Sequence, residues 1–260
     1  MKRGKLFMKG LNEKVIVVAG GASGIGAATA QRLGKEGARV LVGDIRLAGA
    51  EQTAAAVVAA GGVAEPFEFD ISDEPSCAAL IAHAKQQWGT IHGLFNVAAD
   101  LSKENLGRDT DVVTVPLDVL ERTLRVNLMG YFFTARHAIP AMLEAGGGSI
   151  VHTTSGVVLG IDRFCAYGAA KGGVIALSRH IARRWGKEGV RSNAIDPGIT
   201  LTDNQLESVS DEHRAQMLPF VRSPRFGEPH EIAAMVAFVA GPESSYITGS
   251  NLTVDGGMNA

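Results

Sequence analysis

Short runs of β-branched residues alternate along this chain with alanine-rich segments that have helical spacing. The expected strands are mostly continuous apolar runs, and they cover residues 15–19, 40–44, 64–70, 93–97, 149–154, 191–195 and 252–254. The expected helices cover residues 25–36, 47–60, 74–88, 119–144, 167–185 and 231–239. Continuous apolar strands suit a parallel sheet that is buried on both faces. Strand–helix alternation requires right-handed crossovers, so the pattern predicts an α/β fold with a mainly parallel, doubly wound sheet and helices on both faces.

Glycine marks the expected ends of most of these helices. The glycines at these stops are Gly37, Gly61, Gly89, Gly146 and Gly186. Glycine is favoured there because it adopts the left-handed backbone conformation without strain.

The 260 residues contain no internal repeat and no change of composition that would indicate a linker. We therefore expect one domain over residues 11–260, preceded by a mobile basic arm at residues 1–10. Two stretches lack a clear period, at residues 100–116 and 199–225, and the second holds one weak helix near 211–217. Both would leave the carboxyl ends of strands, where ligands bind in open α/β sheets, so we expect them to form substrate walls and a mobile lid.

Composition excludes several classes of function. The 25 Lys and Arg residues nearly balance the 27 Asp and Glu residues, and no basic stripe indicates a nucleic-acid partner. No apolar stretch reaches the roughly 18 residues that a membrane span needs, and no signal peptide is evident, so a soluble cytoplasmic protein is expected. The two cysteines form no disulfide framework, and the scattered histidines form no zinc motif, so no metal is expected.

A glycine-rich turn with the sequence AGGASGIG, residues 19–26, lies between the first expected strand and the first expected helix. Gly20 would take the tight turn, Gly24 would let backbone N–H groups approach a pyrophosphate, and Gly26 would let the helix lie close to the sheet. A glycine trio alone is weak support, but its position between strand and helix predicts a dinucleotide-binding fold of the Rossmann type.

Asp44 ends the second expected strand about 20 residues further on, where a carboxylate would bind the adenosine ribose and repel a 2′-phosphate. NAD is therefore favoured over NADP, although Arg46 lies two residues away and could bind such a phosphate. The alternative is that Asp44 only caps the next helix. Asp70 ends the third expected strand in the analogous place, and the sequence leaves open whether it contacts the adenine.

Tyr167 and Lys171 share one face of an expected helix because they are four residues apart. A free tyrosine has a pKa near 10, so roughly one in a thousand is ionised at neutral pH. An ammonium in a site shielded from water would lower that pKa and make the phenol a base for an alcohol or an acid for a carbonyl. The pair alone is weak support, since many such pairs are a surface lysine beside a core tyrosine, and the dinucleotide turn upstream favours the catalytic interpretation.

Together with Asn127 and Ser155, these motifs resemble the short-chain dehydrogenase/reductase family in order and spacing. The similarity covers nearly the whole chain from about residue 11. It continues through NAIDPG at 193–198, RFGEP at 225–229, ITG at 247–249 and VDGG at 254–257.

The resemblance implies a role for each residue of the site. Tyr167 would be the acid/base, and Lys171 would hold the nicotinamide ribose and lower the tyrosine pKa. Ser155 would stabilise the substrate oxygen, and Asn127, in the middle of a long helix, would hold a proton-relay water. The cofactor contacts that it implies are Gly20, Ser23, Gly24, Ile25, Gly26, Asp44, Asp70, Ile71, Asn96, Ala98, Tyr167, Lys171, Pro197, Gly198, Ile199 and Thr202. The family also implies a homotetramer.

Three positions depart from the family pattern or leave it ambiguous. Ala19 replaces the usual threonine and removes a side-chain hydrogen bond that braces the turn. The segment 96–99, Asn-Val-Ala-Ala, lacks the usual final glycine. The catalytic hydroxyl falls on Ser155 when counted along its strand, and on Thr154 when counted back from the tyrosine. Strand register favours Ser155.

We therefore expect an NAD-dependent oxidoreductase that interconverts a secondary alcohol and a ketone of unknown identity. The enzymatic alternative is a 3-oxoacyl thioester reductase that uses NADPH. A catalytically silent nucleotide-binding regulator is the alternative outside enzymes.

Overall fold

The structure is a computed structural model that describes residues 10–260, so residues 1–9 of the expected basic arm lie outside the described residues. Within this range seven parallel strands form one sheet in the order β3-β2-β1-β4-β5-β6-β7. The strands are β1 Val15–Ala19, β2 Arg39–Asp44, β3 Val63–Glu68, β4 Gly93–Asn96, β5 Gly148–Thr153, β6 Val190–Pro197 and β7 Asn251–Val254. The strand order changes direction between β1 and β4, which creates the switch point where α/β sheets bind ligands.

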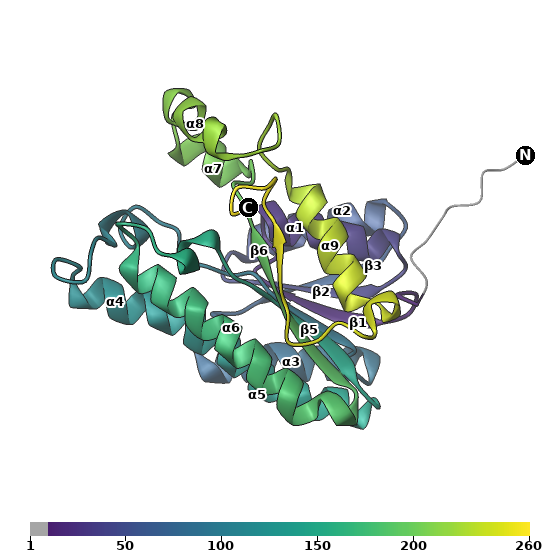
Figure 1. The fold of residues 1–260 in the computed structure, drawn as a ribbon. Coiled ribbons are helices and arrows are strands. Elements are labelled where there is room, and N and C mark those ends of the chain that lie inside the picture. The colour runs from purple at the N-terminus through teal and green to yellow at the C-terminus, as the bar shows by residue number, and fades with distance from the viewer. Residues whose placement is uncertain (1–9) are drawn as a thin grey trace, which may run out of the picture.

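Helices cover both faces of this sheet (Figure 1). They are α1 Gly24–Lys35, α2 Leu47–Ala59, α3 Glu74–Trp88, α4 Leu117–Leu124, α5 Gly130–Glu144, α6 Cys165–Trp185, α7 Asp203–Ser208, α8 Asp211–Met217 and α9 Pro229–Ala240. The expected fold class, a doubly wound α/β sheet, is confirmed.

Successive residues of each central strand enter two separate hydrophobic cores. In β1, Val15 and Val17 join the core under α3, α5 and α6, whereas Ile16 and Val18 join the core under α1, α2 and α9. All four side chains are almost completely buried. Burial on both faces explains why these strands read as continuous apolar runs rather than as alternating ones.

Four of the five expected glycine stops adopt the left-handed conformation, at Gly37, Gly61, Gly89 and Gly146. The fifth, Gly186, follows the last residue of α6 as expected but is not left-handed. Gly186 has φ −62°, so the chain continues into a 3₁₀ turn, and the left-handed residue is Gly189.

The expected continuous helix over 119–144 is also wrong, because a π-helical turn, Arg125–Met129, separates α4 from α5. Asn127 causes a local conflict there. Its side-chain Nδ2 donates to the carbonyl of Thr123 at 3.2 Å, the acceptor that an α-helix reserves for the backbone N–H of residue 127. The turn places Asn127 next to the end of α4 rather than in the middle of a regular helix.

Two further boundaries differ from expectation. β3 ends at Glu68, so Asp70 lies in the loop that follows, where its backbone N–H donates to Ser76 Oγ instead of to a neighbouring strand. The segment 199–225 contains α7 as well as the expected α8, because Thr202 accepts from the N–H of Gln205 and starts a helix. Its polar sequence gave no helical periodicity that could have predicted this turn.

Candidate active site

The carboxyl ends of β1, β4, β5 and β6 lead into the segments that hold most of the expected site residues. The glycine turn follows β1, Ser155 follows β5, and Pro197 ends β6. Tyr167 and Lys171 lie on α6, whose start packs against the 3₁₀ turn at Gly156–Leu159.

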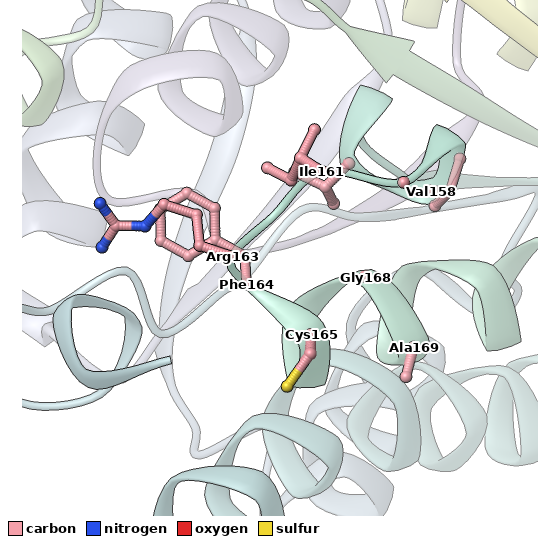
Figure 2. A pocket seen from close by; sticks show the side chains of 9 residues that line it. Val158, Ile161, Arg163, Phe164, Cys165, Gly168 and Ala169 are labelled. Carbon is pink, nitrogen blue, oxygen red and sulfur yellow. The ribbon is translucent and has the colours of Figure 1, made fainter. Parts of the chain in front are cut away.

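A hollow of about 240 Å³ lies between this 3₁₀ turn and the first residues of α6 (Figure 2). Its wall includes Ile161 and Phe164, and the Arg163 guanidinium lies 4.4 Å from the centre of the Phe164 ring. Gly168 and Val157, which lie one and two residues from Tyr167 and Ser155, line the hollow, but the two expected catalytic side chains do not.

The glycine turn fits tightly against its neighbours. Gly20 has φ +107°, and a Cβ at this residue would lie 2.4 Å from the backbone nitrogen of Ala98. A Cβ at Gly26 would lie 1.9 Å from the carbonyl oxygen of Gly20, so only glycine lets α1 start this close to the turn. The turn does not need the usual threonine at position 19. Backbone N–H groups of Gly20 and Gly21 donate to the carbonyl of Gly43 at 2.8 and 2.9 Å.

The N-terminus of α1 suits an anion. No side chain among the described residues caps it, and its first turn carries no acidic residue. Ser23, at the capping position, instead accepts a hydrogen bond from Arg46 at 2.7 Å. Uncapped N–H groups and the positive end of the helix dipole are the features that hold a pyrophosphate in dinucleotide folds.

Asp44 braces this turn and does not cap α2. Its carboxylate accepts from the backbone N–H of Ala22 and from that of Arg46, each at 3.0 Å, whereas α2 has no side-chain cap. The capping alternative is therefore wrong. The Arg46 Nε lies 3.8 Å from the carboxylate, so one acidic and one basic group meet at the edge of the turn.

Two of the expected cofactor contacts, Ile71 and Asn96, are buried, whereas Asp70, Ile25 and Ala98 are partly exposed. Asp70 accepts two hydrogen bonds from Ser72, and Ile71 is buried in the core under α3 and α5. Asn96 is fully buried, with its amide group bonded to the side chains of His152 and Thr134. The other expected contacts in the two turns are Ile25, partly buried against α1's core, and Ala98, which donates to the carbonyl of Ala19 at 2.9 Å.

The segment after β6 lies against both the glycine turn and the C-terminus. The N–H of Gly198 donates to the carbonyl of Val254 at 3.1 Å. A Cβ at Gly24 would lie 3.0 Å from Cγ2 of Thr202, so the two turns are in close contact. The carbonyl of Ile199 accepts a hydrogen bond from the N–H of Gly227 at 3.0 Å. Pro197, Gly198, Ile199 and Thr202 are thus fixed beside the turn.

Lys171 is 1% exposed, and its ammonium group donates to the carbonyl of Thr153 at 2.9 Å and to the hydroxyl of Tyr131 at 3.1 Å. It lies 5.4 Å from the centre of the Tyr167 ring. Burial lowers the pKa of Lys171 to about 7. An ammonium shielded from water therefore accompanies the expected acid/base, as the helical spacing predicts.

The chain alone does not lower the pKa of Tyr167. Burial raises the pKa of this phenol, and the nearby carboxylate of Asp196 raises it further. Asp196 itself is 3% exposed, and burial raises its pKa to about 6. That the Lys171 ammonium, together with the charge of an oxidised nicotinamide, lowers this pKa concerns the site with its cofactor and stays a prediction.

The hydrogen bonds of Thr154 bear on whether Thr154 or Ser155 carries the expected catalytic hydroxyl. Its Oγ1 lies 2.9 Å from Asn251 Oδ1 and 3.2 Å from the carbonyl of Ile195, and the residue is 1% exposed. Ser155 is half-buried and follows the end of β5, with only a 3.5 Å contact from the N–H of Val157. This leaves Ser155 as the hydroxyl that is free to bind a ligand.

Asn127 is fully buried, and its Oδ1 has no hydrogen-bond partner among the described residues. A buried amide oxygen without a partner is costly, and a bound water is the usual remedy. The position therefore fits the water-holding role that the resemblance implies.

No motif in the sequence marks Asp109, which lies in the segment expected to form a substrate wall. Asp109 is fully buried, and its carboxylate accepts from the backbone N–H groups of Ala166 and Tyr167 at 3.1 and 2.8 Å. Asp109 thus fixes the first turn of α6 through backbone hydrogen bonds, one of them from Tyr167, the expected acid/base. Cys165 lies 3.6 Å from the same carboxylate, and burial together with this carboxylate raises the pKa of the thiol, which disfavours the nucleophilic thiolate.

Two kinds of feature are absent from residues 10–260. No group of three or more His, Cys, Asp or Glu residues there could hold a metal ion. No helix in the same range is both long and apolar enough to cross a membrane.

Comparison with known proteins assigns the family. A family model described as enoyl-(acyl carrier protein) reductase matches residues 20–259. A 7α-hydroxysteroid dehydrogenase of Bacteroides fragilis is 35% identical over 254 residues, covering 96% of each chain. A cyclohexanol dehydrogenase of Acinetobacter is 32% identical over 253 residues, covering 97% of each chain. The solved structure of a 7α-hydroxysteroid dehydrogenase complexed with NADH and 7-oxo glycochenodeoxycholic acid superimposes with a TM-score of 0.88 at 28% identity, covering 95% of this chain and 94% of the other. With its glycine turn, its Ser155 hydroxyl and its Tyr167–Lys171 pair, the chain belongs to the short-chain dehydrogenase/reductase family.

Proposed function

We propose that this protein is an NAD-dependent oxidoreductase that interconverts a secondary alcohol and a ketone. The observation that carries the proposal is the buried Lys171 ammonium 5.4 Å from the ring of Tyr167, on a helix that starts at the same edge of the sheet as the glycine turn. The named relatives are dehydrogenases, and the structural neighbour was solved with NADH, which supports both the reaction class and the cofactor.

The residues present fit NAD. The glycine turn leaves no room for side chains, α1 offers an uncapped N-terminus, and Asp44 places a carboxylate at the end of β2. The turn and the first N–H groups of α1 would hold the pyrophosphate, and Asp44 would accept from the adenosine ribose. Lys171 would donate to the second ribose. When bound, the nicotinamide supplies or takes the hydride.

The protein's own residues move the proton and stabilise the oxygen. In the oxidation direction, the phenol oxygen of Tyr167 takes the hydroxyl proton of the alcohol, and in reduction it returns a proton to the carbonyl oxygen. Ser155 donates a hydrogen bond to the same oxygen and stabilises its developing charge. Because burial raises the pKa of Tyr167, the ammonium of Lys171 and the charge of the oxidised cofactor must both act on the phenolate.

A second function is supported by two observations. The matching family model is described as enoyl-(acyl carrier protein) reductase, an enzyme that also acts on acyl thioesters, and Arg46 lies at the edge of the turn where a 2′-phosphate would bind. A 3-oxoacyl thioester reductase that uses NADPH is therefore the competing candidate. A catalytically silent nucleotide-binding regulator is less well supported, because Asn127, Ser155, Tyr167 and Lys171 are all present.

One experiment separates the three. Purified protein is assayed with NAD(H) and NADP(H) against cyclic alcohols, steroids, sugars and acyl thioesters, and cofactor binding is measured by calorimetry. We expect turnover of a secondary alcohol with NAD and weak use of NADP. Turnover of a thioester with NADPH would favour the competing candidate, and tight binding without any turnover would favour the regulator.

We also propose a homotetramer in the cytoplasm. The family resemblance assigns subunit contacts to the helices that begin near residues 119 and 167. Exposed apolar side chains on these elements, among them Leu117, Met129 and Phe132, support such contacts. Analytical ultracentrifugation that finds only monomers would contradict the tetramer.

A further inference from the structure

A chain of buried polar side chains extends from Lys171 across β5 to Asn96 at the end of β4, the strand next to β1. The Lys171 ammonium contacts the hydroxyl of Tyr131 at 3.1 Å, and the Tyr131 ring stacks on that of His152 with centroids 5.7 Å apart. His152 Nδ1 lies 3.2 Å from Asn96 Nδ2, and Asn96 Oδ1 accepts from Thr134 at 2.9 Å. All five side chains are at most 1% exposed.

The direction of the first contact follows from the chemistry of the two groups. An ammonium can only donate, so the Tyr131 oxygen accepts from Lys171. In the orientation that the structure gives Asn96, its carbonyl oxygen accepts from Thr134, so its NH₂ group faces His152 and donates to His152 Nδ1. His152 is therefore neutral, and burial together with the charge of Lys171 lowers its pKa to about 3. The buried side chains beyond Lys171 therefore add no second positive charge beside the ammonium.

Tyr131 can accept this hydrogen bond throughout the working pH range. Its ring is fully buried, and burial raises the pKa of its phenol well above the ordinary value, so it remains neutral. The Lys171 nitrogen also lies 4.5 Å from the centre of the Tyr131 ring, and the quadrupole of an aromatic ring attracts a cation at this range. Together with the carbonyl of Thr153, Tyr131 thus supplies the stabilisation that a desolvated ammonium needs.

We propose that Tyr131 is a positioning residue that favours the charged form of Lys171 and fixes the ammonium beside the ring of Tyr167. The groups that face Lys171 are Tyr131 from α5, His152 and the Thr153 carbonyl from β5, and Tyr167 from α6. Asp196 of β6 acts on Tyr167 rather than on the lysine. Tyr131 is therefore the one hydroxyl that we assign to the ammonium. An effect of Tyr131 on turnover rests on the proposed function, whereas its effect on the protonation of Lys171 does not.

The first test measures Lys171 in the protein without cofactor. Lysine labelled with ¹³C at Cε is titrated by NMR, and the Lys171 signal is identified by its loss in Lys171→Met. We expect Tyr131→Phe to lower the midpoint of the Lys171 titration by about one pH unit, because one hydrogen bond to a charged group is lost. Tyr246→Phe is the matched control, since Tyr246 is fully exposed and its variant should titrate like the wild type. Equal midpoints in Tyr131→Phe and wild type would overturn the proposal.

A double-mutant cycle keeps the test decisive if Tyr131→Phe folds poorly. Unfolding by urea is followed for the two single variants and for Tyr131→Phe/Lys171→Met. If Tyr131 acts through the ammonium, the loss of stability caused by Tyr131→Phe disappears in the Lys171→Met background. An undiminished loss in that background would show that the hydroxyl serves the core alone, whether or not the protein turns over any alcohol.

Discussion

Replacing Asp44 by asparagine tests how the protein selects its cofactor. Asparagine removes the charge and keeps one acceptor oxygen for the two backbone N–H groups that now bind the carboxylate. Two unit charges 4 Å apart repel by about 4 kcal/mol at an effective dielectric constant of 20. The Asp44 side chain is 12% exposed, and Arg46 lies 3.8 Å away, so both solvent and the guanidinium reduce this repulsion. About half of it, ~2 kcal/mol, should separate NADP from NAD in the wild type.

The assay is the ratio of kcat/KM for NADP⁺ to kcat/KM for NAD⁺ with one alcohol. A free-energy difference of ~2 kcal/mol corresponds to an increase of about 30-fold in this ratio for Asp44→Asn. The ratio is the useful quantity, because damage to the turn from the lost second acceptor affects both cofactors alike. Adding Arg46→Ala should reverse part of the gain, since the guanidinium is then no longer present to bind a 2′-phosphate. An unchanged ratio in Asp44→Asn, or a wild type that prefers NADPH, would refute the reasoning.

Three further predictions concern the supports of the site. Gly26→Ala should weaken NAD binding by about tenfold or more in calorimetry, because its Cβ would lie 1.9 Å from a carbonyl of the turn, whereas Gly186→Ala, with nothing within 4 Å, should not. Asp109→Ala should lower the free energy of unfolding in urea by about 3 kcal/mol, because two hydrogen bonds to a buried charge are lost, and an unchanged midpoint would contradict that role. Burial lowers the Lys171 pKa from 10.5 to about 7, so the unfolded state binds more protons between these values and wild-type stability rises with pH across that window. Lys171→Met should be inactive, should be more stable than the wild type at pH 7 and should lack this rise; a parallel pH profile for the two proteins would argue against the lowered pKa.

The parts of the fold that follow local rules could be predicted from the sequence. β1 was expected over 15–19 and α3 over 74–88, and both have these bounds, because apolar continuity and helical spacing are local signals. The glycine turn was predictable for the same reason, since its constraints lie within a few residues. The long helix over 119–144 was not, because the conflict at Asn127 depends on which partner its side chain selects.

In the candidate site, too, local spacing could be predicted from the sequence, whereas contacts between distant residues could not. The four-residue spacing of Tyr167 and Lys171 placed them together, but not the acceptors of the ammonium. Tyr131 precedes Lys171 by 40 residues, and Asp109 precedes Tyr167 by 58. Such contacts are set by how α5 and the loop before α4 pack against α6, and no local pattern marks them. Burial and Asp196 raise the pKa of Tyr167, and neither effect can be read from the sequence because both depend on the folded arrangement.

The most direct test of the account is Tyr167→Phe, which removes the hydroxyl and keeps the ring against the Lys171 ammonium. General acid–base catalysis contributes typically about 10²- to 10⁴-fold, so kcat should fall by at least about a hundredfold. The affinity for NAD, measured by calorimetry, should stay close to that of the wild type, because the turn, Asp44 and Lys171 are unchanged. Wild-type turnover in this variant would contradict the assignment of the acid/base and with it the proposed mechanism.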